Sequence, residues 1–250
     1  MLKVQRKRWK ITAFSYLIEK VVRTIRQFIF GTIIGSFLAV LCVRLPRNES
    51  LLYPPSHCDF CGQRLRPSEM IPLISALRQK FRCSYCQQKF SPRSFGLELF
   101  CGVLCLIFLQ DFQWLKLWHL FWLLSTVVLA VIDWDHLIVE SKIFWSTGLL
   151  LLLSGFLLVP IHWLQPLIIC SFFYLSQKIL PNSLGLGDLW VVGLWSLFLT
   201  GYELLQLLFL ASISGLLFFA YQKFRKKTPE RLPFLPFLFI GLLIILLKNL

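Results

Sequence analysis

The stretch GLGDLWVVGL, residues 185–194, places two glycines and an aspartate directly before an apolar run. Because glycine tolerates positive φ and close backbone approach, we expect a tight turn at Gly185 and Gly187. Asp188 follows that turn, and a carboxylate inside a membrane-like sequence is unfavourable unless it has a function. Taken alone, Asp188 also fits the N-cap of an ordinary helix, where its side chain would accept backbone hydrogen bonds.

A second acidic sequence, Asp133-Trp134-Asp135, ends the apolar run VVLAVI at 127–132 and lies 188 − 133 = 55 residues before Asp188. On a helix, side chains two residues apart point about 200° apart. Only one of Asp133 and Asp135 can therefore face Asp188. The spacing alone does not choose between them.

The composition is that of a membrane protein. Of the 250 residues, 57% are hydrophobic and 15% are charged, whereas a soluble domain carries roughly 25% charged residues. The sequence therefore predicts an all-α polytopic protein embedded in the lipid bilayer. The net charge is +14, but the basic residues cluster between apolar runs, as the positive-inside rule produces. We therefore expect no nucleic-acid partner.

The chain divides into four expected parts. These are a basic N-terminal segment at 1–27, a first transmembrane helix at 28–45, a polar, proline-rich insert at 46–94, and a transmembrane domain at 95–250. A span needs about 20 apolar residues, and with the first helix we expect about seven or eight transmembrane helices. The candidates in the last part are 95–110, 117–132, 142–160, 162–180, 189–202, 204–222 and 233–249.

Two features of the first 45 residues predict how they are used. The apolar stretch 11–18 is too short to span, which favours an amphipathic interfacial segment. The Gly31-x-x-x-Gly35 spacing permits close packing of one membrane helix on another.

The loop charges predict the topology. The insert at 46–94 and the loop at 223–231 are both strongly basic, so both should be cytoplasmic. Counting spans from the insert then brings Asp133 and Asp188 to the same cytoplasmic face. The basic N-terminus falls on the other side, and the sequence leaves that conflict and the choice between seven and eight spans open.

Four cysteines in the insert predict a structural zinc site. Cys58-x-x-Cys61 and Cys83-x-x-Cys86 are separated by 21 residues, an arrangement typical of tetrahedral four-thiolate zinc. A pair of disulfides is the alternative, and a reducing cytoplasm disfavours it. A closed four-thiolate site leaves no position for water, so the ion would fold the insert and take no part in catalysis.

The acidic pair predicts acid–base chemistry at an amide. Two adjacent carboxylates share a proton, because both cannot easily ionise. The ionised one can accept a proton from water while the protonated one polarises the scissile carbonyl. Two other classes of function stay open: a non-enzymatic zinc-containing membrane assembly factor, and a component of a proton-coupled transporter, since intramembrane acids also mark proton relays.

Several motifs together resemble the type IV prepilin peptidases, a family of leader peptidases and N-methyltransferases that also serves competence pseudopilins. The matching stretches are GTIIGSFLAVLCVRLP at 31–46, the four-cysteine stretch at 57–96 leading to Glu98, Asp133, Gly185-x-Gly187-Asp188, and PFLPF at 233–237. They extend over nearly the whole chain.

The resemblance implies an aspartyl endopeptidase in the cytoplasmic membrane with its active site facing the cytoplasm. Asp133 and Asp188 would be catalytic, with Gly185, Gly187 and Asp135 in supporting positions. The substrates would be prepilin or pseudopilin precursors with a short basic leader. The new N-terminus would then be methylated from S-adenosylmethionine, a function that the resemblance links to the zinc insert and Glu98. The sequence does not identify the natural substrate or the oligomeric state.

The chain departs from the family pattern at three places around the acidic pair. Glu140-Ser141 stands where the family usually has Pro-Asp or Pro-Asn, Trp190 where it commonly has Lys, and Leu235 where it has Gly. We expect these departures to affect substrate details more than the peptidase chemistry.

Overall fold

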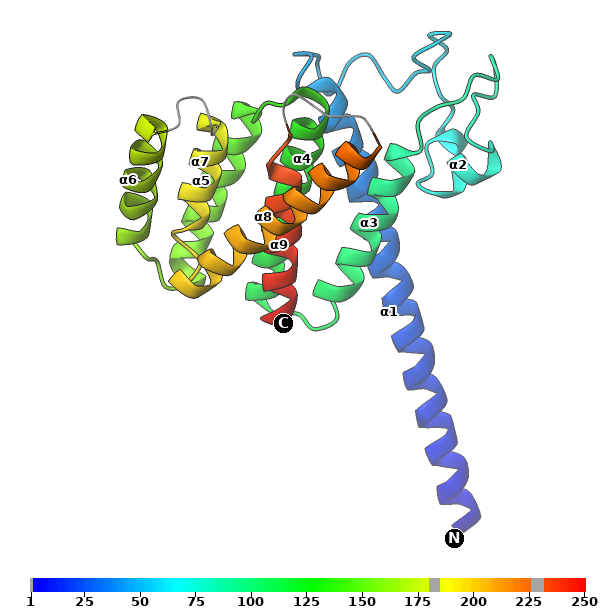
Figure 1. Cartoon of the computed structure of the whole chain (residues 1–250). Helices are drawn as coiled ribbons and strands as arrows, with labels where there is room; N and C mark the ends of the chain where they lie inside the picture. The colour runs from blue at the N-terminus through cyan, green and yellow to red at the C-terminus, as the bar shows by residue number, and fades with distance from the viewer. Residues whose placement is uncertain (1, 180–184, 226–231) are drawn as a thin grey trace. The chain divides into compact units, whose positions relative to one another are not determined.

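The structure is a computed structural model that describes residues 2–179, 185–225 and 232–250, with side chains from Ser15 onward. These residues are almost entirely helical and contain no strand, so the predicted all-α fold is confirmed (Figure 1). The elements in chain order are α1 (Leu2–Arg44), the 3-10 helix η1 (Pro67–Glu69), α2 (Ile74–Arg78), α3 (Arg93–Phe108), α4 (Trp114–His136), α5 (Ser141–Leu158), α6 (Leu164–Ile179), α7 (Leu186–Trp195), α8 (Gly201–Phe224) and α9 (Leu235–Lys248).

Each apolar run predicted from the sequence corresponds to a helix, namely α1 and α3 to α9. Within the described residues, four helices are long and apolar enough to cross a membrane, and α7 and α9 are shorter apolar helices. The multi-pass helical membrane protein is therefore confirmed. The four long helices with α7 and α9 make six, so seven or eight spans are reached only if the 16-residue helices α3 and α6 are counted as well. The four candidate spans are Ser15–Arg44, Trp114–His136, Ser141–Leu158 and Gly201–Phe224.

The N-terminal part differs from the prediction. We expected a separate basic segment at 1–27 and a first span at 28–45, but α1 is one continuous helix that contains both. Among the residues whose side chains are described, its candidate span is Ser15–Arg44. The physical reason is that no glycine or proline precedes Gly31, so nothing in the sequence breaks the helix there. The rest of the predicted division into parts stays a prediction.

The described chain forms two compact units. Unit 1 comprises Met1–Val40 and Ser50–Phe112, and unit 2 comprises Leu41–Glu49 and Gln113–Leu250. In unit 1, α1 lies along α3 at glycine contacts. A Cβ on Gly31 would lie 2.5 Å from the Cys101 carbonyl oxygen, and a Cβ on Gly35 would lie 2.7 Å from the Glu98 Cα. The two glycines therefore bring the helix backbones into direct contact, as their spacing predicted.

In unit 2, α4 is the most buried of the four candidate spans, and α5 and α9 both pack on it. Helix α9 also packs on α8, and α6 packs on α7 (Figure 1). An aromatic cluster joins α4 to the end of α7: the Phe198 ring lies 5.2 Å from that of Trp118 and 5.6 Å from that of Trp122. This packing holds the last turn of α4 and the first turn of α7 within one unit.

We predict that Gly35→Ala destabilises the protein by about 1–3 kcal/mol, the usual range for overpacking. The added Cβ would meet Glu98 backbone atoms, which cannot move aside as a flexible side chain can. Gly96→Ala is the matched control, because Gly96 lies in α3 with nothing within 4 Å of its Cβ position. Thermal unfolding in detergent measures both, and equal effects of the two substitutions would contradict the close-packing account.

Candidate active site and metal site

Asp133 lies in the last turn of α4 and is buried, with 6% of its surface exposed. A buried carboxylate is strongly destabilising unless it is hydrogen-bonded. Its Oδ2 accepts a hydrogen bond from the backbone N–H of Leu235 at 3.0 Å. Leu235 is the first residue of α9, where N–H groups have no partner within the helix and the helix dipole favours negative charge. The start of α9 therefore holds this carboxylate in place.

Asp188 is the third residue of α7 and Gly185 is the N-cap. The reading of Asp188 as an N-cap is therefore wrong. Of the two properties of glycine that favoured a turn here, positive φ is not used at Gly185, which has φ −71°. Glycine is needed for room: a Cβ on Gly185 would lie 3.1 Å from the Asp188 Oδ2, and a Cβ on Gly187 would lie 2.5 Å from the Val139 Cγ2.

Val139 belongs to the short connection that follows α4. The contact of Gly187 with Val139 therefore brings the start of α7 to the end of α4. The Asp188 carboxylate lies close enough to that of Asp133 for the two charges to repel each other. The structure thus brings together the two acidic groups that the sequence predicted would meet.

Asp135 is exposed whereas Asp133 is buried. The two side chains leave opposite sides of α4, as the helix period requires. Of the two, Asp133 is the one whose charge interacts with that of Asp188.

The three departures from the family pattern lie around this pair without removing its contacts. Leu235 supplies a backbone N–H, which any residue except proline would supply equally. Glu140 is the N-cap residue of α5. Trp190 is 58% exposed, and its ring lies 6.0 Å from that of Trp145 on α5. An aromatic surface therefore replaces the positive charge two residues beyond Asp188.

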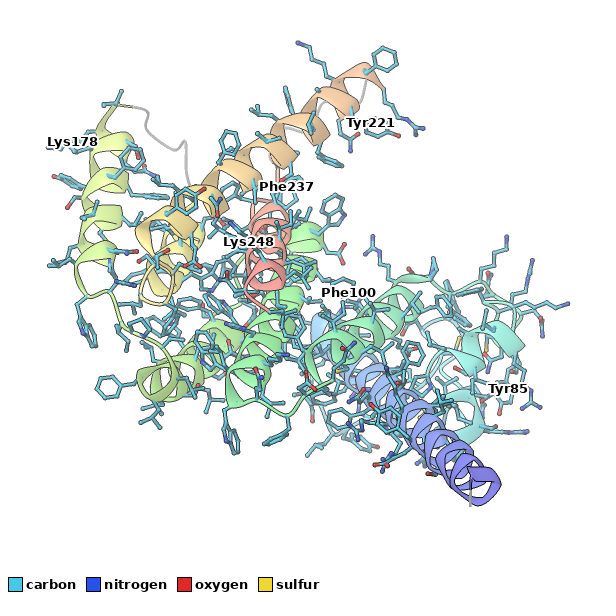
Figure 2. All side chains as sticks on the ribbon, turned by 90° about the horizontal axis from the view of Figure 1, so that it is seen from below. Tyr85, Phe100, Lys178, Tyr221, Phe237 and Lys248 are labelled. Atoms are coloured by element: carbon cyan, nitrogen blue, oxygen red, sulfur yellow. The ribbon has the colours of Figure 1, made fainter. Side chains whose placement is uncertain are left out.

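Sequence reasoning missed the contact between Asp133 and Leu235. The available signal was Pro236, because proline is well tolerated in the first turn of a helix and marks where α9 begins. It also missed an aromatic chain beside the pair. The Trp134 ring lies 5.3 Å from Phe218 on α8, and Phe218 lies 5.7 Å from Phe237 in the first turn of α9. Figure 2 labels Phe237.

The four insert cysteines form one cluster. Their sulfurs all lie within 4.8 Å of one another, and the Cys58 and Cys86 sulfurs are 3.8 Å apart. Tetrahedral zinc with Zn–S bonds of about 2.3 Å requires sulfurs about 3.8 Å apart. All four cysteines are free thiols. The donor set and its spacing therefore fit a zinc ion, and the four residues could hold one.

The two cysteine pairs have the same backbone structure, offset by 25 residues. The Cys58 N–H donates to the Gln63 carbonyl at 3.0 Å, and the Cys83 N–H donates to the Gln88 carbonyl at 2.9 Å. The fifth position of each turn is left-handed, with φ 69° at Gly62 and 60° at Gln87. The backbone N–H groups of Cys86 and Tyr85 point at the Cys83 sulfur and lower the pKa of this thiol to about 7. Tyr85 is labelled in Figure 2.

Glu98 is buried, with 7% of its surface exposed, at the start of α3. Its Oε2 accepts a hydrogen bond at 2.7 Å from the backbone N–H of Leu73 in the insert. Leu73 has φ 60°, which is unusual for a residue other than glycine. Glu98 also lines a cavity of about 360 Å³ between α1, the insert and α3.

A second carboxylate, Glu69, lines the same cavity. A hydrogen bond from the Arg66 backbone N–H, together with one from the Ser84 side chain, holds the pKa of Glu69 below its usual range. The cavity therefore presents three acidic groups, Asp59, Glu69 and Glu98, beside aromatic side chains that include Phe37 and Phe95.

The protein is a multi-pass helical membrane protein with a pair of acidic residues and a four-cysteine insert. Comparison with known proteins identifies its family. Residues 29–112 match the family model described as the bacterial peptidase A24 N-terminal domain. A prepilin leader peptidase/N-methyltransferase of Pectobacterium carotovorum is 30% identical over 257 residues, which cover 85% of this chain and 88% of that protein. The chain therefore belongs to the prepilin leader peptidase/N-methyltransferase family.

Other relatives match over a smaller part of their length. The prepilin leader peptidase/N-methyltransferase of Myxococcus xanthus is 33% identical over 199 residues, 75% of this chain and 59% of that protein. The one from Bacillus subtilis is 44% identical over 64 residues, 26% of each. This chain thus spans less than two thirds of either relative. No solved structure matches.

We predict that Cys83→Ser lowers zinc from about one ion per chain to near zero, because a closed structural site needs all four thiolates. Cys170→Ser is the matched control, since Cys170 is an exposed cysteine outside the cluster. Elemental analysis of the purified membrane protein measures both variants. Zinc retained in full by Cys83→Ser would contradict the assignment of the ligands.

Proposed function

We propose that this protein is a membrane aspartyl endopeptidase that removes the short basic leader of type IV prepilin-like precursors, with Asp133 and Asp188 as its catalytic residues. The observation that carries this proposal is the meeting of these two carboxylates at adjoining ends of α4 and α7. The family names of the relatives supply the substrate class.

The contacts of the pair support different roles for its two members. The Leu235 N–H orients the Asp133 carboxylate as a hydrogen-bond acceptor, so Asp133 takes the proton of the attacking water. Asp188 holds the shared proton and donates a hydrogen bond to the scissile carbonyl oxygen. Attack gives a tetrahedral intermediate. Its collapse breaks the C–N bond as the departing nitrogen receives the proton that Asp133 accepted.

Cleavage would take place on the cytoplasmic side of the cytoplasmic membrane. The basic residues of the insert support this orientation through the positive-inside rule. Lys223 and Arg225 at the end of α8 add to the same argument, while residues 226–231 of that loop lie outside the described residues. A prepilin leader is basic by the family resemblance. By the positive-inside rule it would therefore stay on the cytoplasmic side of the membrane.

Methylation of the new N-terminus is the second proposed activity. The cavity of about 360 Å³ beside the cysteine cluster falls in the usual size range of small-ligand sites. S-adenosylmethionine supplies a methyl group from a positively charged sulfonium. Carboxylates and aromatic faces both attract such a cation, and the cavity offers Glu98, Glu69, Phe37 and Phe95. The zinc ion would fix the insert that forms one wall.

We predict that Asp133→Asn and Asp188→Asn each lower leader removal by at least about 100-fold, the scale of acid–base catalysis. Intact-mass measurement of a co-expressed pseudopilin reports the cleavage. Asp135→Asn is the matched control, because Asp135 lies two residues from Asp133 but is exposed. Normal cleavage by either of the first two variants, at unchanged protein level, would overturn the aspartyl mechanism.

We predict that Glu98→Gln lowers the methylated fraction about tenfold or more, because hydrogen bonds and contacts of a charged group are worth about 1.5–3 kcal/mol. Leader removal should persist, so the same spectrum separates the two activities. Glu49→Gln is the control, since Glu49 is an acidic residue that does not line the cavity. Equal methylation by the Glu98 variant and the wild type would reject this cavity as the methyl-donor site.

A further inference from the structure

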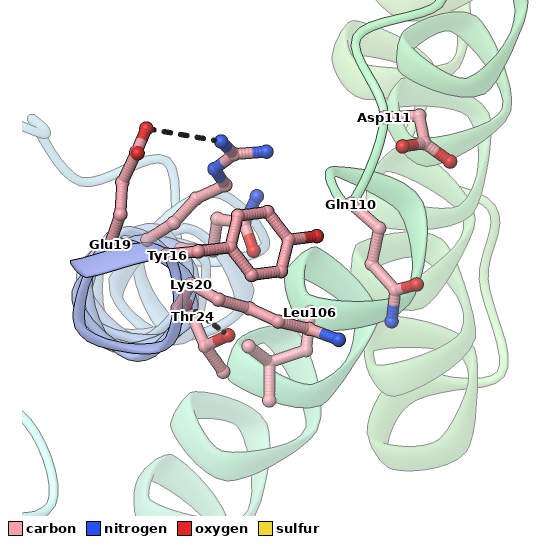
Figure 3. Close-up of a pocket in the computed structure, with 9 residues that line it drawn as sticks. Tyr16, Glu19, Lys20, Thr24, Leu106, Gln110 and Asp111 are labelled. Atoms are coloured by element: carbon pink, nitrogen blue, oxygen red, sulfur yellow. Dashed lines mark hydrogen bonds and ion pairs between the residues drawn. The ribbon is translucent and has the colours of Figure 1, made fainter. Parts of the chain in front are cut away.

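A second cavity lies at the other end of α3 from the insert. It has a volume of about 380 Å³ and is formed by one face of α1 and the end of α3 (Figure 3). The proposed peptidase and methyltransferase chemistry makes no use of it. Its lining residues are Tyr16, Glu19, Lys20, Arg23, Thr24, Gln27, Leu106, Gln110 and Asp111.

The part of α1 beside this cavity is amphipathic, with its polar side facing the protein and its apolar side exposed. The cavity-lining positions of α1, from Tyr16 to Gln27, recur at spacings of three and four residues and form one polar stripe. The other face is apolar and about half exposed, at Ile18 (49%), Val21 (55%) and Ile25 (52%). A helix in water would show the reverse arrangement. Lipid on the apolar face explains the pattern, and the polar stripe then needs a polar occupant.

The depth of the cavity follows from one contact and the length of α1. The Gln27 side-chain amide donates a hydrogen bond to the Leu109 carbonyl, just beyond the end of α3. From Gln27 to Arg44 the helix rises about 26 Å, close to the roughly 30 Å of the hydrocarbon core. The stripe from Tyr16 to Thr24 therefore lies at the depth of the lipid headgroups.

The cavity carries charges of both signs. Lys20 and Arg23 are basic, and Glu19 and Asp111 are acidic. Arg23 and Glu19 form an ion pair at 3.5 Å with 54% and 68% of their side chains exposed, and such a pair contributes little and opens readily. Ammonium and guanidinium groups bind phosphate, whereas the carboxylates attract an ammonium and repel a purely anionic group.

We propose that this cavity binds the zwitterionic headgroup of an aminophospholipid, with the phosphate at Lys20 and Arg23 and the ammonium at Asp111, on the other side of the cavity (Figure 3). The acyl chains extend towards the bilayer centre along the exposed apolar residues that follow Gln27 on α1, which include Ile29 and Ile33. A bound lipid of this kind anchors the N-terminal half of α1, which extends past the end of α3, at the membrane surface. The proposal is independent of the peptidase chemistry.

Native mass spectrometry of the full-length protein, titrated with phosphatidylethanolamine or phosphatidylglycerol, tests the site. The wild type should bind phosphatidylethanolamine more tightly. Arg23→Gln should weaken that binding about fivefold, the effect of losing one exposed ion pair with the phosphate. Arg26→Gln is the matched control, because Arg26 is an exposed arginine on the same helix outside the cavity. It should change binding less than twofold.

Two further measurements test whether Asp111 selects the ammonium group and whether binding needs the acyl chains. Asp111→Asn should remove the preference for phosphatidylethanolamine over phosphatidylglycerol. Free phosphoethanolamine should compete poorly, because it lacks the acyl chains. Equal losses from Arg23→Gln and Arg26→Gln, an undiminished preference in Asp111→Asn, or tight binding of free phosphoethanolamine would each overturn the lipid site.

Discussion

The hydrogen bond from the Leu235 N–H to the Asp133 carboxylate is the interaction on which the arrangement of the second unit depends. It makes a buried acid tolerable at the end of α4, and it fixes where α9 begins. Helix α9 then runs between α4 and α8, with Leu235, Leu238 and Leu242 fully buried. Gly241 allows this packing, since a Cβ there would lie 3.0 Å from the Leu207 carbonyl oxygen. One polar contact therefore sets the register of an otherwise apolar interface.

The apolar runs of the sequence predicted the helices, whereas loop charge and the count of spans predicted only that Asp133 and Asp188 would lie on one face of the membrane. The reason is that apolar runs of sufficient length must become helices in lipid, where every backbone group needs a partner. What the sequence could not predict were contacts made by backbone atoms. The Leu235 N–H is invisible in a residue pattern because the side chain at that position is irrelevant to the bond. The basic residues of the N-terminal segment do not mark a helix boundary, because charge does not interrupt a helix, and α1 is therefore continuous.

Glycine has a steric role in this fold more than a conformational one. Among the glycines of the described residues, Gly62 is the one with positive φ. At Gly31, Gly35 and Gly187, by contrast, the space that a Cβ would occupy already holds a neighbouring backbone or side chain. The glycine signature before Asp188 therefore marks a place where two segments touch. This explains how a short helix of 10 residues, α7, delivers its carboxylate to the end of α4 without a strained turn.

Glu98 has both a structural and an electrostatic role, so different substitutions at this position test different properties. Its Oε2 accepts the Leu73 N–H, which holds a residue with φ 60°, a conformation that costs of order 1–3 kcal/mol unless its surroundings fix it. The same carboxylate contributes charge to the cavity beside the cysteine cluster. An amide at this position keeps an oxygen that can accept the Leu73 hydrogen bond and removes only the charge. An alanine would remove both, so its effect on methylation could arise from displacement of the insert alone.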